Sequence, residues 1–215
     1  MNYLRKVEGA VQLIRESIER YPAITLGSSF GKDSMVTLHL VRVVKPDIPV
    51  FSVLADTEFP ETYEFARRIV ALYGLNCTEY LFRQEKGGKC CGRPKVEKTK
   101  EALKHFDAWI SGVRKTEGIT RSDFEAVEEK GGLVKVNPIL DFTELDIWRY
   151  LALNQVPLNP MYLKGYRSLG CMLCSTPEED ESETEREGRW RGTPDARGEC
   201  GIHTEPLRYS LRCTE

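Results

Sequence analysis

The chain lacks a strong excess of either charge, a long apolar run and an apolar N-terminal segment. With 31 Lys and Arg against 33 Asp and Glu, its formal net charge is −2, so no basic field indicates nucleic-acid binding. No apolar run reaches the roughly 20 residues of a membrane span. The charged start at 1–6 is not followed by the apolar region of a secretory signal. We therefore expect a cytoplasmic protein with neither a membrane nor a nucleic acid as a partner.

The chain contains seven cysteines, several of them close together in the sequence. At 215 residues, 40% of them hydrophobic, it is long enough for a domain with a sizeable core and needs no disulfides to fold. Clustered cysteines in the cytosol indicate metal binding or catalysis. Cys90 and Cys91 are adjacent, and Cys171 and Cys174 form a C-M-L-C pair, so four thiolates are available to one metal. Cys200, in the run E-C-G-I-H, is then left as a candidate nucleophile.

Apolar periodicity predicts alternating helices and strands. Helices are predicted over 4–20, 35–44, 62–73, 96–106 and 144–153, and strands over 24–26, 49–54, 77–82, 108–112 and 133–136. This alternation predicts an α/β fold with a parallel sheet covered on both faces. Regular patterning fades after Tyr166. The charged run 178–191 has no apolar stripe, so we expect a solvated, mobile segment there.

A turn rich in glycine and serine, at 27–34, joins the first predicted strand to a helix. Small residues let backbone N–H groups approach a phosphate, the helix N-terminus adds positive potential, and serine hydroxyls add donors. Lys32 is followed by Asp33, so the turn departs from the Walker pattern, and an ordinary turn with capping serines explains it as well. Asp56 and Thr57 follow the next strand. Both segments are thus expected at the sheet edge where open parallel sheets bind ligands.

Together these motifs resemble the assimilatory sulfonucleotide reductases, which reduce adenylyl sulfate (APS) or its 3′-phosphorylated form (PAPS) to sulfite. The resemblance covers about residues 20–205. The matching runs are S-S-F-G at 28–31, D-T-E-F-P-E-T-Y at 56–63, C-C at 90–91, W-I-S-G-V-R at 109–114, T-R at 120–121, N-P-I at 137–139, G-Y-R-S-L-G-C at 165–171, R-E-G-R-W at 186–190 and E-C-G-I-H at 199–203. The resemblance implies a parallel-sheet, adenine-nucleotide alpha-hydrolase-like (PP-loop) domain over 1–170. An irregular C-terminal catalytic segment over 171–215 is expected to form one structural unit with it.

The resemblance also implies a 4Fe-4S cluster held by four cysteines: Cys90, Cys91, Cys171 and Cys174. From spacing alone, a tetrahedral zinc site and four free buried cysteines stay open as alternatives. A lysine matching Lys95 lies between cluster and substrate in the family. Pro94 stands where the family usually has an arginine, so this contact stays open.

Family resemblance further implies that Cys200 is the nucleophile. Its thiolate attacks the sulfate sulfur, releases AMP and forms S-sulfocysteine, from which a thiol of thioredoxin or a glutaredoxin-like protein frees sulfite. His203 either lowers the pKa of this thiol or binds substrate. Arginine suits the anionic substrate because its planar fork binds oxyanions bidentately. The implied substrate-binding residues are Ser28, Ser29, Phe30, Gly31, Asp56, Thr57, Lys95, Arg121, Arg186 and Arg189, with Arg114 as a further candidate.

Several functions stay open. The cluster cysteines resemble the APS-using branch, which makes APS the preferred substrate, but S-S-F-G resembles the PAPS-using branch, so PAPS is an alternative main or second substrate. K-D-S at 32–34 resembles the pyrophosphate loop of ATP-using adenylyltransferases and thiolation enzymes, although E-C-G-I-H argues against that class. A redox or iron-responsive regulator is a third class, but the sequence has no recognisable DNA-binding element. The resemblance also implies a homo-oligomer.

Overall fold

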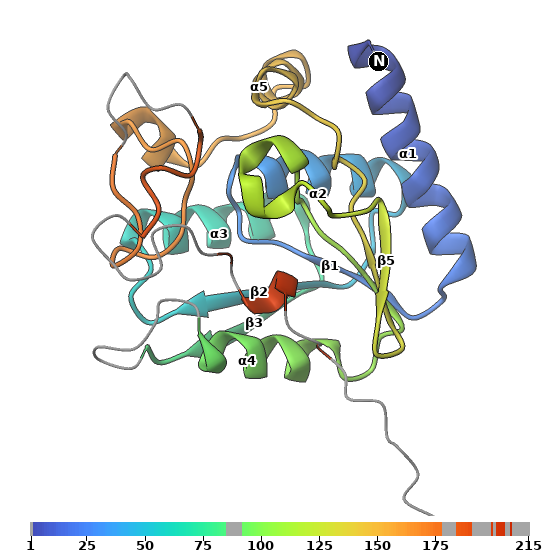
Figure 1. The fold of residues 1–215 in the computed structure, drawn as a ribbon, viewed down its shortest axis with the longest axis horizontal. Helices are drawn as coiled ribbons and strands as arrows, with labels where there is room; N and C mark the ends of the chain where they lie inside the picture. The colour runs from blue at the N-terminus through green and yellow to red at the C-terminus, as the bar shows by residue number, and fades with distance from the viewer. Residues whose placement is uncertain are drawn as a thin grey trace, which may run out of the picture.

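The computed structural model describes residues 2–84, 92–177, 184–190, 199, 201–204 and 207, which fold around one sheet (Figure 1). Its strands are β1 (Ile24–Gly27), β2 (Val50–Ala55), β3 (Cys77–Phe82), β4 (Ala108–Ile110), β5 (Val127–Lys130) and β6 (Leu133–Val136). They lie in the order β3-β2-β1-β4-β6-β5. β1 pairs in parallel with β2 and β4, β2 with β3, and β4 with β6. The predicted α/β fold with a parallel sheet is confirmed.

One strand departs from the parallel arrangement. β5 is missing from the prediction because its V-E-E-K sequence has no apolar alternation, and it runs antiparallel to β6. Gly131 and Gly132 join the two strands with φ of 63° and 76°, the left-handed backbone that a tight hairpin turn needs. The charged side chains of β5 also discourage another chain from pairing with this edge.

Helices cover both faces of the sheet. They are α1 (Tyr3–Arg20), α2 (Lys32–Val44), α3 (Pro60–Tyr73), α4 (Arg93–Leu103), α5 (Glu144–Leu153) and α6 (Gly201–Thr204), with 3-10 turns η1 (Lys115–Glu117), η2 (Ile119–Arg121) and η3 (Pro160–Lys164). The largest hydrophobic cluster joins α1, α2, α3 and α5 to one face. On the other face α4 packs with Phe51, Trp109 and Leu133 (Figure 1).

Local signals explain where two helices depart from their predicted bounds. α2 begins directly after Gly31, which occupies the N-cap position in extended conformation, rather than at Met35. α4 lies three residues earlier than the predicted 96–106. Pro94 stands in its first turn, where a missing backbone N–H costs no hydrogen bond. Both helices therefore begin three residues earlier than predicted, nearer the carboxyl edge of the sheet where the candidate site lies, and α2 is also three residues longer.

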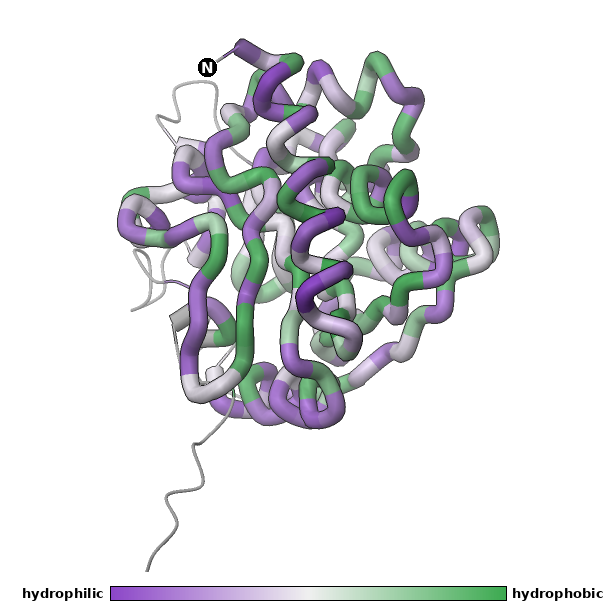
Figure 2. Tube along the Cα trace, turned by 90° about the vertical axis from the view of Figure 1, so that its right-hand side faces the viewer, coloured by the Kyte–Doolittle hydropathy of each residue, from purple (hydrophilic) through white to green (hydrophobic). Residues whose placement is uncertain are grey.

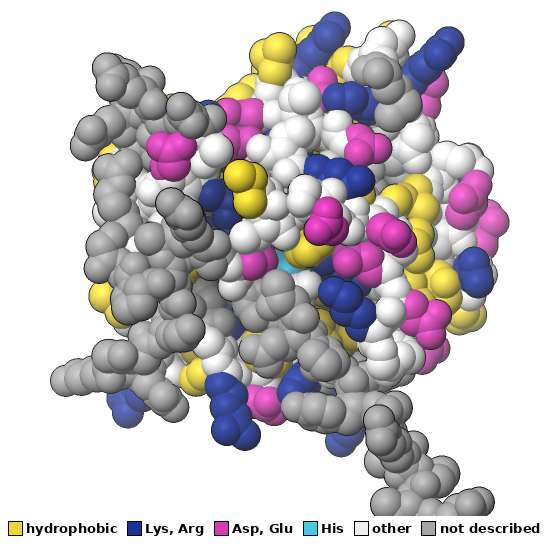
Figure 3. Space-filling model, in the orientation of Figure 1, with side chains coloured by type: hydrophobic (Ala, Val, Ile, Leu, Met, Phe, Trp, Pro, Cys, Tyr) yellow, Lys and Arg dark blue, Asp and Glu magenta, His cyan; other side chains and the backbone are white. Residues whose placement is uncertain are grey.

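Hydrophilic and hydrophobic residues alternate along the chain instead of gathering in one apolar segment (Figure 2). Among the described residues, no helix is long and apolar enough to cross a membrane. On the face in Figure 3, basic and acidic side chains of the described residues are interspersed. This mixed distribution agrees with the near-zero net charge of the sequence.

Candidate active site

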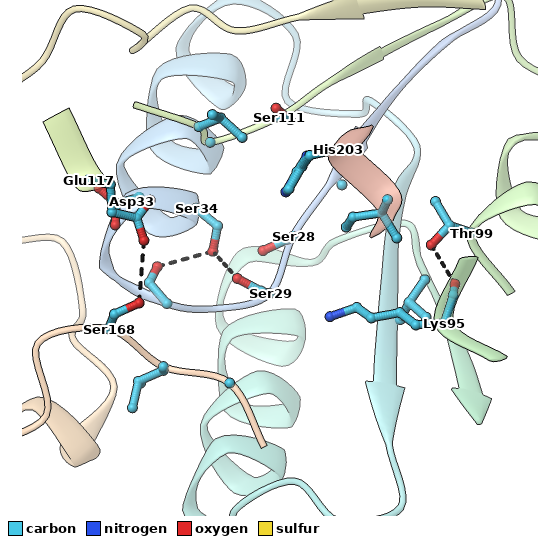
Figure 4. A pocket seen from close by; sticks show the side chains of 18 of the residues that line it. Ser28, Ser29, Asp33, Ser34, Lys95, Thr99, Ser111, Glu117, Ser168 and His203 are labelled. Atoms are coloured by element: carbon cyan, nitrogen blue, oxygen red, sulfur yellow. Dashed lines mark hydrogen bonds between the residues drawn. The ribbon is translucent and has the colours of Figure 1, made fainter. Parts of the chain in front are cut away.

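A pocket lies at the carboxyl ends of β1 and β4 and continues between the sheet and α4 (Figure 4). Its walls come from the turn after β1, the start of α2, α4, the turn at 168–170, the segment 186–189 and α6. Eight predicted site residues line it: Ser28, Ser29, Gly31, Lys95, Arg121, Arg186, Arg189 and His203. Residues that are far apart in the sequence thus share one cavity.

The turn after β1 brings hydroxyls and an α-helix N-terminus to the pocket. Ser34 Oγ donates to the Gly31 carbonyl at 3.0 Å and lies 3.4 Å from Ser29 Oγ (Figure 4). Phe30 has a φ of 55°, and its fully buried side chain packs in the main core. Phe30 therefore shapes this turn from the core side, while the serines face the pocket. An anion at this helix end would gain favourable potential.

Asp56 and Thr57 hold the ends of β2 and β3 together and are not among the described residues that line the pocket. Asp56 Oδ1 accepts a hydrogen bond from the Gln84 N–H at 3.0 Å, and Thr57 Oγ1 donates to Gln84 Oε1 at 3.1 Å. The Thr57 carbonyl accepts from the Met172 N–H at 2.9 Å. Both residues therefore lie beside the C-M-L-C segment.

The C-M-L-C pair is buried beside the pocket. Cys171 and Cys174 are each 2% exposed, and their sulfurs lie 3.6 Å apart. Cys171 Sγ is 3.5 Å from Oε1 of Gln84, the last described residue before the segment that contains Cys90 and Cys91. Those two cysteines lie outside the described residues, and the described ranges contain no group of three or more potential metal ligands. Two buried thiols at this spacing fit half of a four-thiolate metal site.

Arg189 connects the cysteine pair to the pocket. Its Nη2 lies 3.4 Å from Cys174 Sγ, its Nε donates to the Cys174 carbonyl at 3.3 Å, and its Nη1 donates to the Leu169 carbonyl at 2.9 Å. The guanidinium lies over the Trp190 ring, 4.5 Å from its centroid. Gly170 makes this approach possible, because a Cβ there would lie 2.8 Å from Cys174 Sγ and collide with the guanidinium.

The charged run 178–191 is largely buried where it is described. Within 184–190, Glu185 is 4% exposed, Arg189 7% and Trp190 3%. Charge pairing, rather than an apolar stripe, buries these residues, and hydrophobic periodicity cannot detect it. The expectation of a solvated segment is therefore wrong for Glu185, Arg189 and Trp190, while Thr184 and Glu187 are exposed as expected.

Lys32 belongs to a buried ion network and does not line the pocket. Its Nζ lies 2.9 Å from Glu185 Oε2 and 3.6 Å from Asp33 Oδ2, and it donates to the Arg167 carbonyl. Arg114, also fully buried, donates to Asp33 and, at 2.6 Å, to Glu185 Oε2. Burial opposes the charge of Lys32, but its neighbours, Asp33 foremost and then Tyr162 and Glu185, outweigh burial and raise its pKa. Both cations are thus committed to pairs inside the protein.

A second cluster of arginines and glutamates forms the wall beside η1 and η2. Arg121 donates from Nε to Glu199 Oε2 at 2.6 Å, from Nη2 to Glu199 Oε1 at 3.0 Å, and from Nη1 to Glu117. Arg186 donates from Nη2 to Glu199 Oε1 at 3.0 Å and pairs with Glu117 at 3.6 Å. Burial disfavours ionisation of Glu199, but the hydrogen bond and charge of Arg121 outweigh it and lower its pKa. Both carboxylates are therefore ionised.

Three residues of the C-terminal run E-C-G-I-H line the pocket near α4. Cys200 lies outside the described residues, while Glu199, Ile202 and His203 line the pocket. The His203 ring stacks on Trp109, with centroids 6.1 Å apart and planes 7° apart. Burial, then Lys135 and Arg121, lower the pKa of His203 well below its ordinary value, so its imidazole is neutral. Its buried Nδ1 has no hydrogen-bond partner among the described residues.

Sequence comparison with known proteins identifies the family of this chain. The family model for the phosphoadenosine phosphosulfate reductase domain matches residues 23–177. An adenosine 5′-phosphosulfate reductase of Lysinibacillus sphaericus is 33% identical, over 91% of this chain and 91% of its own length. A phosphoadenosine 5′-phosphosulfate reductase of Alkalilimnicola ehrlichii is 36% identical, over 90% and 86%. The chain belongs to the phosphoadenosine phosphosulfate reductase family. It is thus an oxidoreductase of the class that the sequence motifs predict, and the resemblance is confirmed.

Solved structures place the fold of this reductase family member in a wider group. A phosphoadenylyl-sulfate reductase from Candida auris, in complex with phosphate, aligns with a TM-score of 0.64 at 21% identity, covering 76% of this chain and 88% of that one. An FMN adenylyltransferase from Candida glabrata aligns with a TM-score of 0.67 at 19% identity, covering 92% and 77%. These likenesses confirm the adenine-nucleotide alpha-hydrolase-like fold.

Several pocket residues of this reductase family member are absent from the sequence prediction. Tyr162 accepts a hydrogen bond from the Lys32 N–H at 2.8 Å, and Glu58 and Trp109 line the pocket directly. Glu58 and Trp109 lie within two of the runs that match the family, D-T-E-F-P-E-T-Y and W-I-S-G-V-R, and these matches could have marked them as site residues. Tyr162 lies in an irregular segment with no motif, so no sequence pattern marks it.

Proposed function

We propose that this protein reduces APS to sulfite and AMP, using Cys200 as nucleophile and an external dithiol as electron donor, in sulfate assimilation for cysteine biosynthesis. The observation that carries the proposal is the pocket itself. A hydroxyl-rich turn at a helix N-terminus, Lys95 and three arginines face one cavity, and both Glu199 and the α6 segment, which flank Cys200 in the E-C-G-I-H run, border it.

The two ends of the pocket suit the two ends of a sulfonucleotide. Phe51, Val53 and Trp109 give one end an apolar lining that suits adenine. The turn at 28–31 and the N-terminus of α2 offer donors for the phosphate. Lys95, whose ammonium points into the pocket in Figure 4, is suited to the sulfate, as are Arg186 and Arg189.

The reaction balances with one cysteine and one dithiol. The Cys200 thiolate attacks the sulfate sulfur, an S–S bond forms, and the S–O bond breaks with its electron pair leaving on the AMP phosphate. A thiolate of thioredoxin or a glutaredoxin-like protein then attacks Cys200 Sγ, and sulfite leaves with the electron pair of the S–S bond. The second thiol of the reductant resolves the mixed disulfide and regenerates Cys200. The neutral imidazole of His203 is available to accept a hydrogen bond from the thiol or from substrate.

Cys171 and Cys174, with Cys90 and Cys91, would hold a 4Fe-4S cluster, with zinc as the less favoured occupant. Such a cluster would supply electrostatic and structural organisation of the sulfate end, because the dithiol already supplies both electrons. Lys95 then serves the sulfate from α4, where Pro94 precedes it in the first turn.

PAPS is the alternative main or second substrate, and the family includes relatives named for either nucleotide. An ATP-using function is disfavoured by one observation. The lysine of the K-D-S run is paired with Glu185 and Asp33 and does not face the cavity. A homo-oligomer remains part of the proposal through the resemblance alone.

The deciding experiment measures sulfite release from APS and, separately, from PAPS by anaerobically purified protein with thioredoxin and dithiothreitol. We expect release that is faster with APS and abolished in Cys200→Ser. Release from neither nucleotide, by protein shown to contain iron and sulfide, would overturn the proposal. An ATP–pyrophosphate exchange assay would then test the ATP-using alternative.

A further inference from the structure

We propose that the phenol of Tyr162 donates a hydrogen bond to the nucleotide phosphate, which makes Tyr162 a substrate-binding residue that η3 contributes to the pocket. Tyr162 lines the pocket together with the turn at 28–31 and the start of α2. It belongs to none of the sequence runs that match the family. The inference deepens the proposed function and rests on it for the identity of the ligand.

The turn after β1 fixes the position of the phenol oxygen. Lys32 is the first residue of α2, and its N–H, which has no partner within the helix, donates to Tyr162 Oη at 2.8 Å. A Cβ on Gly31 would lie 3.0 Å from Tyr162 Oη and 3.7 Å from Ser29 Oγ. The phenol oxygen therefore lies beside a serine hydroxyl at the wall of the pocket.

The proton of this phenol is left for a second partner. A phenol accepts one hydrogen bond and donates another, and the Lys32 N–H already occupies the acceptor side of Tyr162. Among the described residues, no group accepts the phenol proton. Burial raises the pKa of Tyr162 to about 12, so the phenol keeps its proton at neutral pH. Tyr162 thus offers the pocket an uncharged donor.

The ring is held in place from several sides. Trp148 meets it edge-on, with centroids 5.8 Å apart and planes at 89°, and Lys32 Nζ lies 5.3 Å from its centroid. η3 is itself anchored by the fully buried Asn159, which accepts from the Met161 N–H at 3.0 Å and donates to Thr62 Oγ1 at 3.1 Å. Because the donor is already ordered, binding to it costs little conformational entropy.

An anion is the ligand that this arrangement fits. The Lys32 N–H and the phenol form a relay that extends the positive end of α2 one group further into the cavity. The ammonium of Lys32 instead lies in the buried network with Asp33 and Glu185 and does not line the pocket. The phenol therefore brings to a phosphate the helix potential that the lysine side chain does not.

The same hydrogen bond acts on the leaving group of the proposed reaction. The electron pair of the S–O bond leaves on the AMP phosphate, so the negative charge of that phosphate grows toward the transition state. A hydrogen bond to the phosphate strengthens as this charge grows, and it therefore raises kcat as well as affinity.

The test uses Tyr162→Phe, which removes one oxygen and keeps the ring. Equilibrium binding of AMP and of adenosine to the anaerobically purified protein is measured. Since the lost hydrogen bond joins a charged group, we expect AMP affinity to fall about 10- to 150-fold, while adenosine affinity changes less than about twofold. Tyr150→Phe is the matched control, because its hydroxyl bonds to His39 Nδ1 at 2.9 Å and it does not line the pocket. The control should bind both ligands as wild type does.

A multiply fluorinated tyrosine at position 162 separates donation to the ligand from support of the turn. Fluorination lowers the pKa of the phenol, and the resulting phenolate accepts the Lys32 N–H better than the phenol does but cannot donate. The groups that face this phenol are Lys32, Asp33 and Glu117, all of which are present in wild type as well. We expect AMP affinity to be lost as the pH rises above neutral in the fluorinated protein, and to stay constant in wild type over the same range.

Three outcomes would overturn the inference. Equal losses of AMP and adenosine affinity in Tyr162→Phe would show that Tyr162 only shapes the turn. Unchanged AMP affinity would show that the phenol does not reach the phosphate, and wild type that binds AMP no better than adenosine would show that the pocket holds no phosphate. If AMP is preferred in wild type and this preference is lost in Tyr162→Phe, the inference stands, even where neither APS nor PAPS yields sulfite and the proposed function fails.

Discussion

Replacing Lys32 with methionine separates a structural role from a phosphate-binding role for this residue. The substitution keeps the apolar stem but removes the ammonium that lies 2.9 Å from Glu185 and 3.6 Å from Asp33. Arg114 alone then faces both carboxylates, so the buried network is left with one uncompensated negative charge. Removing one partner from a buried ion pair typically costs about 3–5 kcal/mol.

That cost is measurable as a shift in the unfolding temperature. For a chain of this length about 1 kcal/mol corresponds to roughly 2–4 °C, so the expected fall for Lys32→Met is about 6–20 °C. AMP affinity should change by less than about twofold, because Lys32 does not line the pocket. Calorimetric or spectroscopic melting and equilibrium AMP binding measure the two effects on the same preparation.

Two further variants sharpen this prediction. Lys32→Met combined with Glu185→Gln restores a neutral network and should recover about half of the lost stability. Lys164→Met is the control, because its pair with Glu61 is 54% exposed on the lysine side and such pairs are worth less than about 1 kcal/mol. An unfolding temperature equal to that of wild type, together with a tenfold loss of AMP affinity, would refute the structural role.

Other predictions concern packing, acid stability and thiol reactivity. Gly170→Ala should lower the free energy of unfolding by about 1–3 kcal/mol and reduce bound iron, because a Cβ at this position has no room. Gly9→Ala is the control, because a Cβ at Gly9 would meet open space. Equal denaturant midpoints for Gly170→Ala and wild type would contradict the packing argument. Burial opposes ionisation of Glu117, but Arg121 outweighs it and lowers the pKa of Glu117. The stability that ionised Glu117 contributes is therefore complete above the ordinary glutamate pKa of 4.5 and declines at lower pH. The free energy of unfolding in urea should fall more steeply from about pH 5 to 3 in wild type than in Glu117→Gln. Parallel curves for the two proteins would contradict this prediction. Burial raises the pKa of Cys77 to about 11, so iodoacetamide should modify it about 100-fold more slowly than free cysteine at pH 8, as peptide mass spectrometry would measure.

Apolar periodicity predicts those elements whose side chains meet the core. β6 and α5 have the predicted bounds, because each carries an apolar pattern of its own. β3 also has the predicted bounds, although only Phe82 among its side chains is buried. β5 and η2 escape this signal, since their residues are held by hairpin geometry and by ion pairs. Pattern reasoning therefore gives the sheet and its covering helices but omits the polar strand at its edge.

Linear motifs predict which residues approach the pocket better than they predict where each side chain points. Ser28 and Ser29 reach the cavity, but the side chain of Phe30 between them and Gly31 enters the core at a positive φ. The sequence alone does not reveal this alternation of side-chain direction, because the alternation depends on the conformation of the turn. Asp56 and Thr57 likewise meet the predicted sheet edge yet bond to Gln84 beside the cysteine pair.

The buried glutamates that pair with lysine and arginine side chains cannot be predicted from the sequence. Glu117, Glu185 and Glu199 come from segments with no apolar stripe, and such residues are ordinarily solvated. Their burial is possible only because each meets an arginine or lysine contributed by a distant segment. The number of arginines near the pocket therefore overstates its affinity for anions. That affinity also depends on which cations the protein's own carboxylates already hold, as Asp33 and Glu185 hold Lys32 and Arg114.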